Sequence, residues 1–287
     1  MSLPVRPAGD FLARMAAASE ARVAAALRHV PEAALRSRAL RLPPPPALAL
    51  SPTRFDVIAE VKRRSPAAGT LAAGALKVAA QGRSYVRGGA AALSVLTEPA
   101  EFQGQLAHLV EVAAAAGDVP CMRKDFLVAP YQLYEARVSG AGGVLLIVAM
   151  LDDARLADMV DVALQLGLFV LLEVFDAGDV MRLRPLLRRL CPPRADGRVR
   201  YLVGVNCRDL RTLQVDFGRF AALARELPVG VPKVAESGVE SVAQAARVAE
   251  LGYELALVGT ALMRATDPAR LLAELIAAGR SSVGEPA

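Results

Sequence analysis

Eight short runs of apolar residues, each followed by a longer stretch of helical periodicity, constrain the fold of this chain more than any other feature of its sequence. The runs begin near residues 55, 91, 119, 143, 168, 201, 230 and 254. Their spacing, roughly 24 to 35 residues, suits units of one strand and one helix joined by short loops. Because the runs are apolar almost throughout, we expect strands that are buried on both faces, as in a parallel sheet covered by helices.

This repeat predicts an α/β fold, and eight such units close most naturally into a (βα)8 TIM barrel. A chain of 287 residues is long enough for one barrel domain. An open doubly wound sheet is the alternative, but no run is followed by the GxGxxG pattern of a dinucleotide-binding half. Glycines at 88–89, 140, 167 and 252 stand where a helix would end before the next strand.

The residues outside the repeat form an N-terminal extension and a short tail. Residues 10–40 have the pattern of one or two helices, with Asp10 as the N-cap, and a proline-rich stretch then forms an extended connector. We expect the extension to lie over one end of the barrel and residues 277–287 to be frayed. The predicted units are a helical extension with its connector at 1–50, a catalytic barrel at 51–278 and a C-terminal tail at 279–287.

Composition argues against several classes of function. No run approaches the length of about 18 apolar residues that a membrane helix needs, and the N-terminus lacks a signal-peptide core, so we expect a soluble, cytoplasmic protein without a membrane partner. The net charge is +5, and the arginines are scattered without interleaved aromatic residues, which argues against nucleic-acid binding. Three separate cysteines and two isolated histidines indicate neither a disulfide framework nor a metal site.

Lysine is rare in this chain, because among 34 basic residues the lysines are Lys62, Lys77, Lys124 and Lys233 alone. A lysine in so arginine-rich a chain marks a position that arginine serves poorly, since an ammonium lowers its pKa more readily and can donate a proton. Lys62 and Lys124 both stand at the ends of predicted strands. A lysine beside another cation in a partly dry site is easier to deprotonate, so we expect a lowered lysine pKa there.

The C-terminal ends of the predicted strands are unusually polar, and this is the end at which (βα)8 barrels build their active sites. In the first strand, Ile58, Glu60 and Lys62 share one face, so two charges project to the same place. One such charge is usually a solvated loop residue, but five strands that do this in one ring must pair their charges or use them. An acid–base site without metal or histidine is therefore predicted. Its polar set is Glu60, Lys62, Lys124, Glu173, Asn206 and Glu236, and Arg208 follows closely after Asn206.

Two short motifs suggest a phosphate site beside this polar set. The tripeptide ESG, residues 236–238, follows the seventh run, and VGT, residues 258–260, ends the eighth. Glycine lets backbone N–H groups approach an anion, and a neighbouring hydroxyl adds a donor. Structural turns use the same residues, but barrels of this kind frequently bind phosphate with the loops after strands 7 and 8. The two motifs together therefore predict a phosphorylated ligand.

These strand ends together resemble those of indole-3-glycerol phosphate synthase, the ring-closing enzyme of tryptophan biosynthesis. The matching stretches, from residue 57 to about 268, are VIAEVKRRSPAAG, AAALSVLTEPAEFQG, MRKDFLVAPYQLYEARVSGAGGVLLIVAML, LLEVF, VGVNCRDLRTLQVD, VAESGV and LVGTALMRATDP. The resemblance implies a carboxy-lyase that uses no cofactor and acts on a small phosphorylated substrate, 1-(2-carboxyphenylamino)-1-deoxyribulose 5-phosphate. The family closes the pyrrole ring and then loses carbon dioxide and water to give indole-3-glycerol phosphate.

The resemblance also implies a role for each matching residue. Lys124 would protonate the substrate carbonyl during ring closure, and Glu173 would act as an acid or base in the proton transfers. Lys62 would bind the anthranilate carboxylate and donate a proton in dehydration, while Glu60 and Asn206 would orient the groups around them. The implied binding residues are Ser65, Gly238, Gly259 and Thr260 for phosphate, Ser237 and Glu236 along the site, Arg208 for the carboxylate or Glu173, and Phe102, Phe126 and Leu210 for the aromatic ring.

The match departs from the family pattern at two positions of the site. Cys207 follows Asn206 where a second asparagine is expected, and Thr260 replaces the usual serine but keeps its hydroxyl. A rival interpretation is another phosphosugar barrel such as phosphoribosylanthranilate isomerase, which would need a Cys/Asp acid–base pair that is not evident here. A non-catalytic relative, which would bind an anionic metabolite or a partner enzyme, is the other alternative. The partners that the resemblance suggests are other tryptophan-pathway enzymes.

Overall fold

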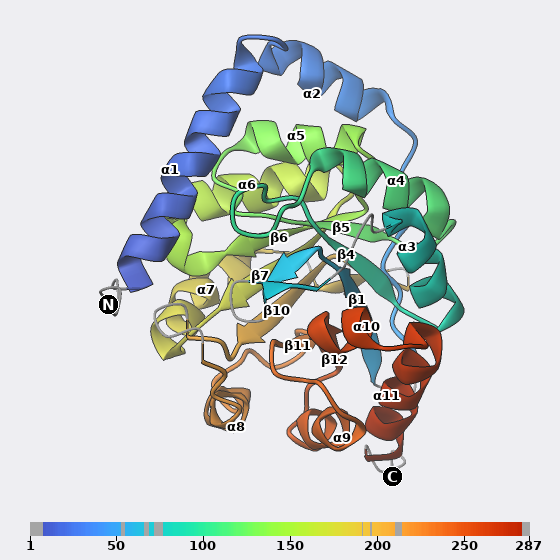
Figure 1. The fold of residues 1–287 in the computed structure, drawn as a ribbon. Helices are drawn as coiled ribbons and strands as arrows, with labels where there is room; N and C mark the ends of the chain where they lie inside the picture. The colour runs from blue at the N-terminus through green and yellow to red at the C-terminus, as the bar shows by residue number, and fades with distance from the viewer. Residues whose placement is uncertain are drawn as a thin grey trace, which may run out of the picture.

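A computed structural model of the chain shows a closed barrel of eight parallel strands (Figure 1). The structure describes residues 8–52, 55–65, 69–71, 77–190, 192–195, 197–209 and 214–282. The barrel strands are β1 (Asp56–Val61), β4 (Ala92–Leu96), β5 (Cys121–Lys124), β6 (Gly143–Ile147), β7 (Phe169–Val174), β10 (Tyr201–Asn206), β11 (Lys233–Glu236) and β12 (Leu255–Val258). Neighbours pair in the order β1–β12–β11–β10–β7–β6–β5–β4, and β4 pairs again with β1. The predicted (βα)8 barrel is confirmed, and all eight apolar runs form its strands.

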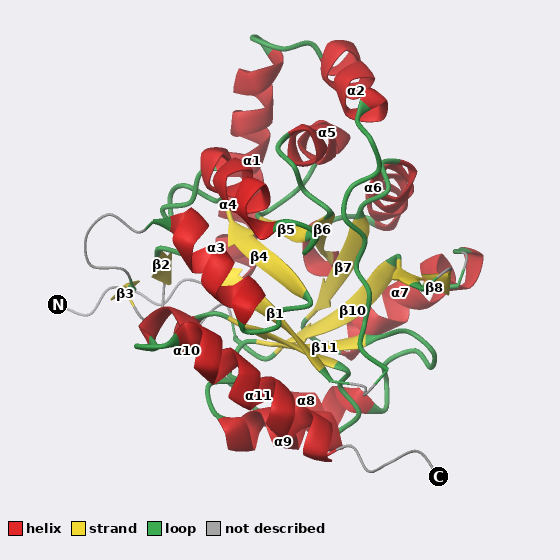
Figure 2. Cartoon of the chain, turned by 90° about the vertical axis from the view of Figure 1, so that its right-hand side faces the viewer, coloured by secondary structure: helices red, strands yellow, loops and turns green. Residues whose placement is uncertain are grey.

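Helices alternate with these strands and cover the outside of the barrel (Figure 2). They are α3 (Val78–Arg87), α4 (Leu106–Ala116), α5 (Pro130–Val138), α6 (Asp153–Gln165), α7 (Ala177–Arg189), α8 (Gly218–Ala224), α9 (Val242–Glu250), α10 (Thr260–Arg264) and α11 (Pro268–Ser282). Short additional elements are the 3-10 helix η1 (Val148–Met150) and two hairpins, β2 (Arg64–Ser65) with β3 (Gly69–Thr70) and β8 (Arg194–Ala195) with β9 (Arg198–Val199). The glycines predicted at helix ends include four with positive φ, namely Gly89, Gly140, Gly167 and Gly252.

Alternation along each strand separates an outer core from a barrel interior. On β1, Val57, Ala59 and Val61 pack outward against the helices, whereas Ile58 points into the barrel. The interior layer includes Ile58, Met122, Leu145, Leu171, Leu202, Val234 and Leu255. Glu60 continues the inward face of Ile58, so its carboxylate lies above this apolar layer. The pattern read from the sequence therefore delivers charge to the C-terminal mouth of the barrel.

The N-terminal extension forms two helices, α1 (Ala8–Leu27) and α2 (Glu32–Arg41). The expectation of one or two helices is confirmed, but Asp10 is not an N-cap, because α1 begins at Ala8 and Asp10 lies in its first turn. α1 runs along one side of the barrel and α2 packs against α5 (Figure 1). The connector then crosses the N-terminal end of the barrel, where Leu48 bridges to Val199.

The C-terminal helix is longer than the sequence predicted. α11 continues to Ser282, so the expected fraying is wrong over residues 277–282. The helix is held there because Arg280 donates to Asp56 Oδ1 at 2.8 Å and to the Phe55 carbonyl at 3.0 Å. Residues 283–287 lie outside the described part of the chain. Across the described ranges, no helix has both the length and the apolar character needed to cross a bilayer.

Candidate active site

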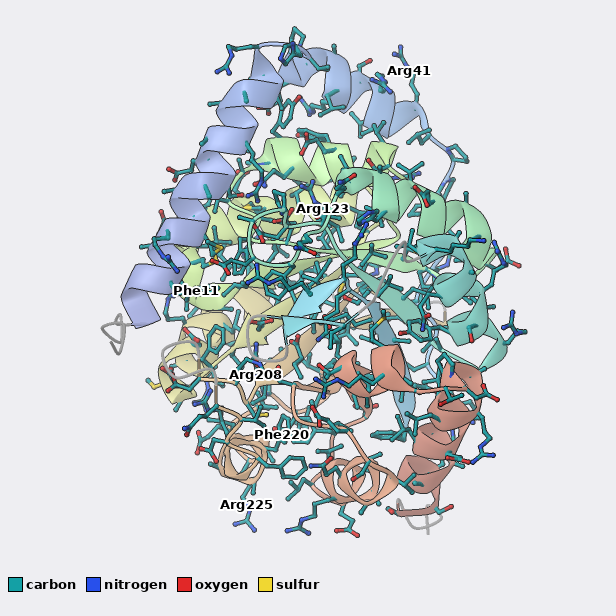
Figure 3. All side chains as sticks on the ribbon, viewed as in Figure 1. Phe11, Arg41, Arg123, Arg208, Phe220 and Arg225 are labelled. Atoms are coloured by element: carbon teal, nitrogen blue, oxygen red, sulfur yellow. The ribbon has the colours of Figure 1, made fainter. Side chains whose placement is uncertain are left out.

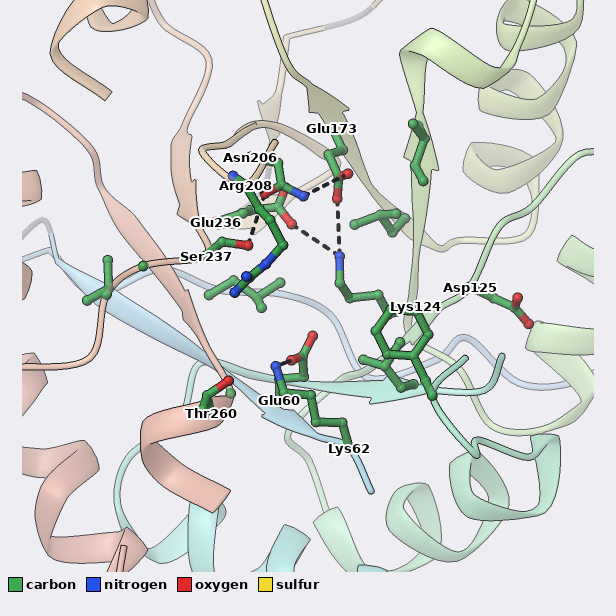
Figure 4. Close-up of a pocket in the computed structure, with 18 of the residues that line it drawn as sticks. Glu60, Lys62, Lys124, Asp125, Glu173, Asn206, Arg208, Glu236, Ser237 and Thr260 are labelled. Carbon is green, nitrogen blue, oxygen red and sulfur yellow. Dashed lines mark hydrogen bonds and ion pairs between the residues drawn. The ribbon is translucent and has the colours of Figure 1, made fainter. Parts of the chain in front are cut away.

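A cavity opens at the C-terminal mouth of the barrel, where the predicted polar strand ends meet (Figure 4). Its walls come from all eight barrel strands, the loops that follow them, and α1. The predicted site residues that line it are Glu60, Lys62, Phe102, Lys124, Phe126, Glu173, Asn206, Arg208, Glu236, Ser237, Gly238, Gly259 and Thr260. Two predicted residues cannot be placed in the same way, because Leu210 and the side chain of Ser65 lie outside the described part of the structure.

Lys124 at the end of β5 is the centre of the charged cluster. Its Nζ lies 3.1 Å from Glu173 Oε2 on β7 and 3.4 Å from Glu236 Oε2 on β11. The two glutamates are almost fully buried, whereas the lysine side chain keeps 18% of its surface exposed. The ammonium therefore holds two inward carboxylates together while it still reaches the open space of the mouth (Figure 4).

The electrostatic surroundings of Lys124 differ from those expected from the sequence. Burial by itself lowers the pKa of Lys124, but the carboxylates of Glu173, Glu236 and Glu60 outweigh it, so the pKa is raised above its ordinary value of 10.5. The expected lowering is therefore wrong for this lysine, because the barrel surrounds it with carboxylates and not with a second cation. A protonated ammonium suits a role as an acid.

Glu236 is the most constrained carboxyl group of the cluster. It is 1% exposed, and its Oε1 has no hydrogen-bond partner in the described residues. Burial and then the negative charge of Glu173 raise the pKa of Glu236 well above 4.5, while Lys124 opposes the shift. The lack of a side chain at Gly204 creates the space, since a Cβ there would lie 2.0 Å from Glu236 Oε1. Glu236 is thus a carboxyl that can hold a proton beside a second carboxyl.

The second charged pair lies across the cavity from Lys124 (Figure 4). Lys62 Nζ is 2.6 Å from Glu60 Oε1, and both side chains are largely buried. Gly259, which follows β12, makes room for this pair, because a Cβ there would lie 2.2 Å from Glu60 Oε1 and 2.9 Å from Lys62 Nζ. The face-sharing of Glu60 and Lys62 predicted from strand alternation therefore becomes a direct ion pair.

Asn206 at the end of β10 fixes the orientation of Glu173. Its Nδ2 donates to Glu173 Oε1 at 3.1 Å. Its Oδ1 accepts from the Ser237 hydroxyl at 2.9 Å and from the Arg208 backbone N–H at 3.0 Å. Since the oxygen accepts two donors, the amide must present its nitrogen to Glu173. The Asn206 amide therefore links Glu173 on β7 to the turn after β11 through hydrogen bonds.

The turn after β11 contains two consecutive residues with positive φ, and one of them is not a glycine. Ser237 has φ +67° and Gly238 has φ +75°, and positive φ is uncommon for a residue with a side chain. The buried Cys207 thiol donates to the Ser237 carbonyl at 3.2 Å and helps to hold this conformation. Burial raises the pKa of Cys207 to about 12. The cysteine that departs from the family pattern is thus a neutral support beneath the turn.

Sequence reasoning missed several residues of the cavity. Phe11 on α1 lies edge-on to Phe126 with ring centroids 5.9 Å apart, and its position beside the barrel is visible in Figure 3. Nothing in the pattern of the extension marks that phenylalanine. Asp125 also lines the cavity, and its place directly after Lys124 in the sequence was a signal that could have found it. The other missed lining residues are Leu96, Leu145, Ile147, Val239, Glu240 and Leu257.

The rival isomerase interpretation needs a cysteine and an aspartate that face each other across the barrel. Cys121 and Cys207, the cysteines within the described ranges, are buried, and neither lines the cavity. The mouth instead holds two lysine–glutamate clusters, Lys62 with Glu60 and Lys124 with Glu173 and Glu236. A closed (βα)8 barrel with such clusters at the C-terminal ends of its strands has the architecture of a barrel enzyme, and these side chains are groups that can give and take protons.

The particular family follows from comparison with known proteins. A family model described as indole-3-glycerol phosphate synthase matches residues 12–275, and the chain belongs to this family. The indole-3-glycerol phosphate synthase of a Parafrankia species is 46% identical over 249 residues, which cover 86% of this chain and 88% of that protein. The one from Micrococcus luteus is 47% identical over 221 residues and covers 77% of each chain.

Solved structures support the fold alone. 3-Hexulose-6-phosphate synthase from Salmonella typhimurium has a TM-score of 0.61 at 12% identity and covers 79% of this chain and 99% of its own. Thiamine phosphate pyrophosphorylase from Pyrococcus furiosus has a TM-score of 0.57 at 16% identity and covers 81% of this chain and 98% of its own.

Family membership confirms the resemblance read from the sequence. The chain is an enzyme of the carboxy-lyase class that acts in tryptophan biosynthesis.

Proposed function

We propose that Lys124 is the acid that drives ring closure in 1-(2-carboxyphenylamino)-1-deoxyribulose 5-phosphate. The observation that carries this proposal is the placement of its ammonium, between two buried carboxylates and open to the cavity. In the first step the ring carbon that bears the carboxylate attacks the ketone carbon of the sugar. The carbonyl oxygen takes a proton from Lys124 and becomes a hydroxyl, so a C–C bond forms as the C=O π bond breaks.

Two losses complete the reaction. Carbon dioxide leaves from the attacked ring carbon, and its bonding electrons restore the aromatic ring. The new hydroxyl then leaves as water after it gains a proton, while a base removes a proton from the five-membered ring. We propose that Lys62 donates in this dehydration and that Glu173 takes up or returns protons. Asn206 holds Glu173 in place through a hydrogen bond of 3.1 Å, and Glu60 holds Lys62 through an ion pair of 2.6 Å.

The remaining predicted residues would bind two different parts of the substrate, the phosphate and the aromatic ring with its carboxylate. We propose that Gly238, Gly259 and Thr260 bind the phosphate with Ser65, because the first three lie together at the ends of β11 and β12. We propose that the aromatic ring lies against an apolar wall, with polar groups at its carboxylate end. We propose Phe102, Phe126 and Leu210 for the wall, Arg208 for the carboxylate or Glu173, and Glu236 and Ser237 along the polar ring; all of these except Leu210, which lies outside the described residues, line the cavity.

The setting of the enzyme also stays a proposal. We propose that it works in the cytoplasm without a nucleic-acid or membrane partner and without a cofactor, and that other enzymes of the pathway are the partners to test. The division into an extension at 1–50 and a barrel at 51–278 is likewise the prediction from sequence. Each of these points rests on composition or on the family resemblance.

The experiment that tests the proposed roles supplies the substrate and follows the fluorescence of the indole product. We expect turnover by the wild-type chain, and we expect Lys124→Ala to fold normally but to lose nearly all of it. One well-placed acid is worth roughly 10²- to 10⁴-fold in rate. Retained turnover in Lys124→Ala would show that the acid has been assigned to the wrong residue.

A further inference from the structure

Asp125 is a buried carboxylate that the proposed mechanism does not use. It follows Lys124 directly, and its side chain is 1% exposed. Its oxygens accept four hydrogen bonds, from Arg22 Nη2 at 2.8 Å, Arg123 Nη2 at 3.1 Å, Thr97 Oγ1 at 2.7 Å and the Phe126 backbone N–H at 2.8 Å. A carboxylate so fully satisfied serves as a rigid anchor, because moving it would break several charge-assisted bonds at once.

Two side chains of α1 bond to Asp125 and to the residue that follows it, Phe126. Arg22 reaches the Asp125 carboxylate, and the Ser19 hydroxyl donates to the Phe126 carbonyl at 2.5 Å. Ser19 and Arg22 are three residues apart on the helix, so they lie on the same face. The Gln132 side chain in turn donates to the Ser19 oxygen at 2.8 Å. The N-terminal extension is therefore bonded to the two residues that come directly after the proposed acid.

The end of β5 depends on this support because its own ladder is short. The pairing of β5 with β6 covers Met122 and Arg123 and stops before Lys124. On the other side β4 still reaches the lysine, because the Thr97 N–H donates to its carbonyl at 3.0 Å. The strand end is thus held by β4 on one side and by the residues bonded to α1 immediately beyond it.

Asp125 does not act on Lys124 through direct electrostatics. Figure 4 shows its carboxylate pointing away from the lysine ammonium. The ammonium instead faces Glu173 on β7 and Glu236 on β11, with Glu60 on β1 as the third carboxylate that acts on it. A change at Asp125 or Arg22 would therefore affect the lysine through its position.

We infer that Asp125 and Arg22 are positioning residues for Lys124, and that their ion pair lets α1 fix the place where the acid meets the substrate. This inference rests on the proposed role of Lys124. Arg22 also lies 3.8 Å from Glu98 Oε1, and that carboxylate accepts from the Phe102 backbone N–H at 3.1 Å. Arg22 thus ties the loops after β4 and β5 to the same helix. Displacement of a catalytic group by about 1 Å can cost about 10²-fold in rate.

The test uses Arg22→Gln, because Arg22 is partly exposed and Asp125 keeps its other three donors in that variant. We expect kcat to fall at least tenfold while KM rises less than about threefold, and we expect Arg22→Lys to recover much of the rate because it keeps the charge. The matched control is Arg28→Gln, since Arg28 lies just beyond α1 and donates to the Ala24 carbonyl on the exposed surface. Its kcat should stay at the wild-type value.

A second variant and the separate outcomes keep the test decisive. Asp125→Asn should lower kcat at least as much as Arg22→Gln, in protein whose circular dichroism matches the wild type. The inference would be overturned if Arg22→Gln left kcat unchanged, or if it lowered kcat no more than Arg28→Gln does. A rise in KM alone would also overturn it, and would place the effect at the Phe102 wall. If Lys124→Ala is inactive but Arg22→Gln is normal, the inference fails while the proposed acid stands. If Lys124→Ala is active, the proposed role itself fails.

Discussion

Replacement of Gly259 by alanine should disable the enzyme from a position that carries no side chain. A Cβ at this site would lie 2.2 Å from Glu60 Oε1, whereas ordinary van der Waals contact begins at 3.4 Å. The carboxylate must therefore move by about 1.2 Å, and Lys62, at 2.6 Å from the same oxygen, loses its partner or moves with it. Misplacement of this size can cost about 10²-fold in kcat, equivalent to about 2.7 kcal/mol of transition-state stabilisation.

The assay for this prediction is steady-state formation of the indole product, followed by fluorescence over a range of substrate concentrations. Gly218→Ala is the matched control, because the neighbour of a Cβ there is the exposed Asp216 carboxylate at 3.1 Å, which can move aside. Gly259 also belongs to the proposed phosphate site, so KM should rise together with the fall in kcat. If KM rises while kcat is unchanged, the clash is absorbed on the phosphate side and the reasoning about Glu60 and Lys62 is refuted.

Two further predictions concern charge and packing. Glu173→Gln removes the nearest carboxylate charge from Lys124, so the lysine pKa should fall relative to the wild type. A lysine-selective NMR titration compared with Lys124→Ala would measure this, and an unchanged value would contradict it. In the wild type the raised pKa means that the stability from this pair is full below about pH 10.5 and is lost as pH rises through the native pKa. Gly279→Ala would place a Cβ 2.0 Å from the buried Phe55 ring, so we expect about 1–3 kcal/mol of destabilisation in thermal unfolding relative to Gly218→Ala, and equal stability would refute the clash.

The sequence predicted the fold well because each unit of a (βα)8 barrel is built from local patterns. An apolar run of four to six residues, a helical stretch and a glycine at the helix end are all visible in a short window. The end of the chain was predicted less well, because α11 is held past residue 277 by bonds from Arg280 to residues 55 and 56. Contacts across more than 200 residues leave no local signal in the helix that makes them.

The candidate site divides in the same way between local and long-range information. Alternation on β1 by itself placed Glu60 and Lys62 on one inward face, and this became an ion pair of 2.6 Å. The partners of Lys124, Glu173 and Glu236, lie 49 and 112 residues further along the chain, so they meet the lysine only because the barrel closes. Closure therefore decided that carboxylates surround the lysine and raise its pKa, where the sequence suggested a neighbouring cation.

What the sequence alone determined was the set of chemical groups and the end of the barrel at which they gather. Strand periodicity and the topology rule for parallel barrels are enough for that, because both depend on which residues end each strand. Only the tertiary structure decided which groups touch and what holds them, including the contact of α1 with Asp125 and Phe126 beside the proposed acid. The physical reason is that distances and dielectric surroundings of a buried charge depend on every element that packs around it, and these elements are remote in sequence.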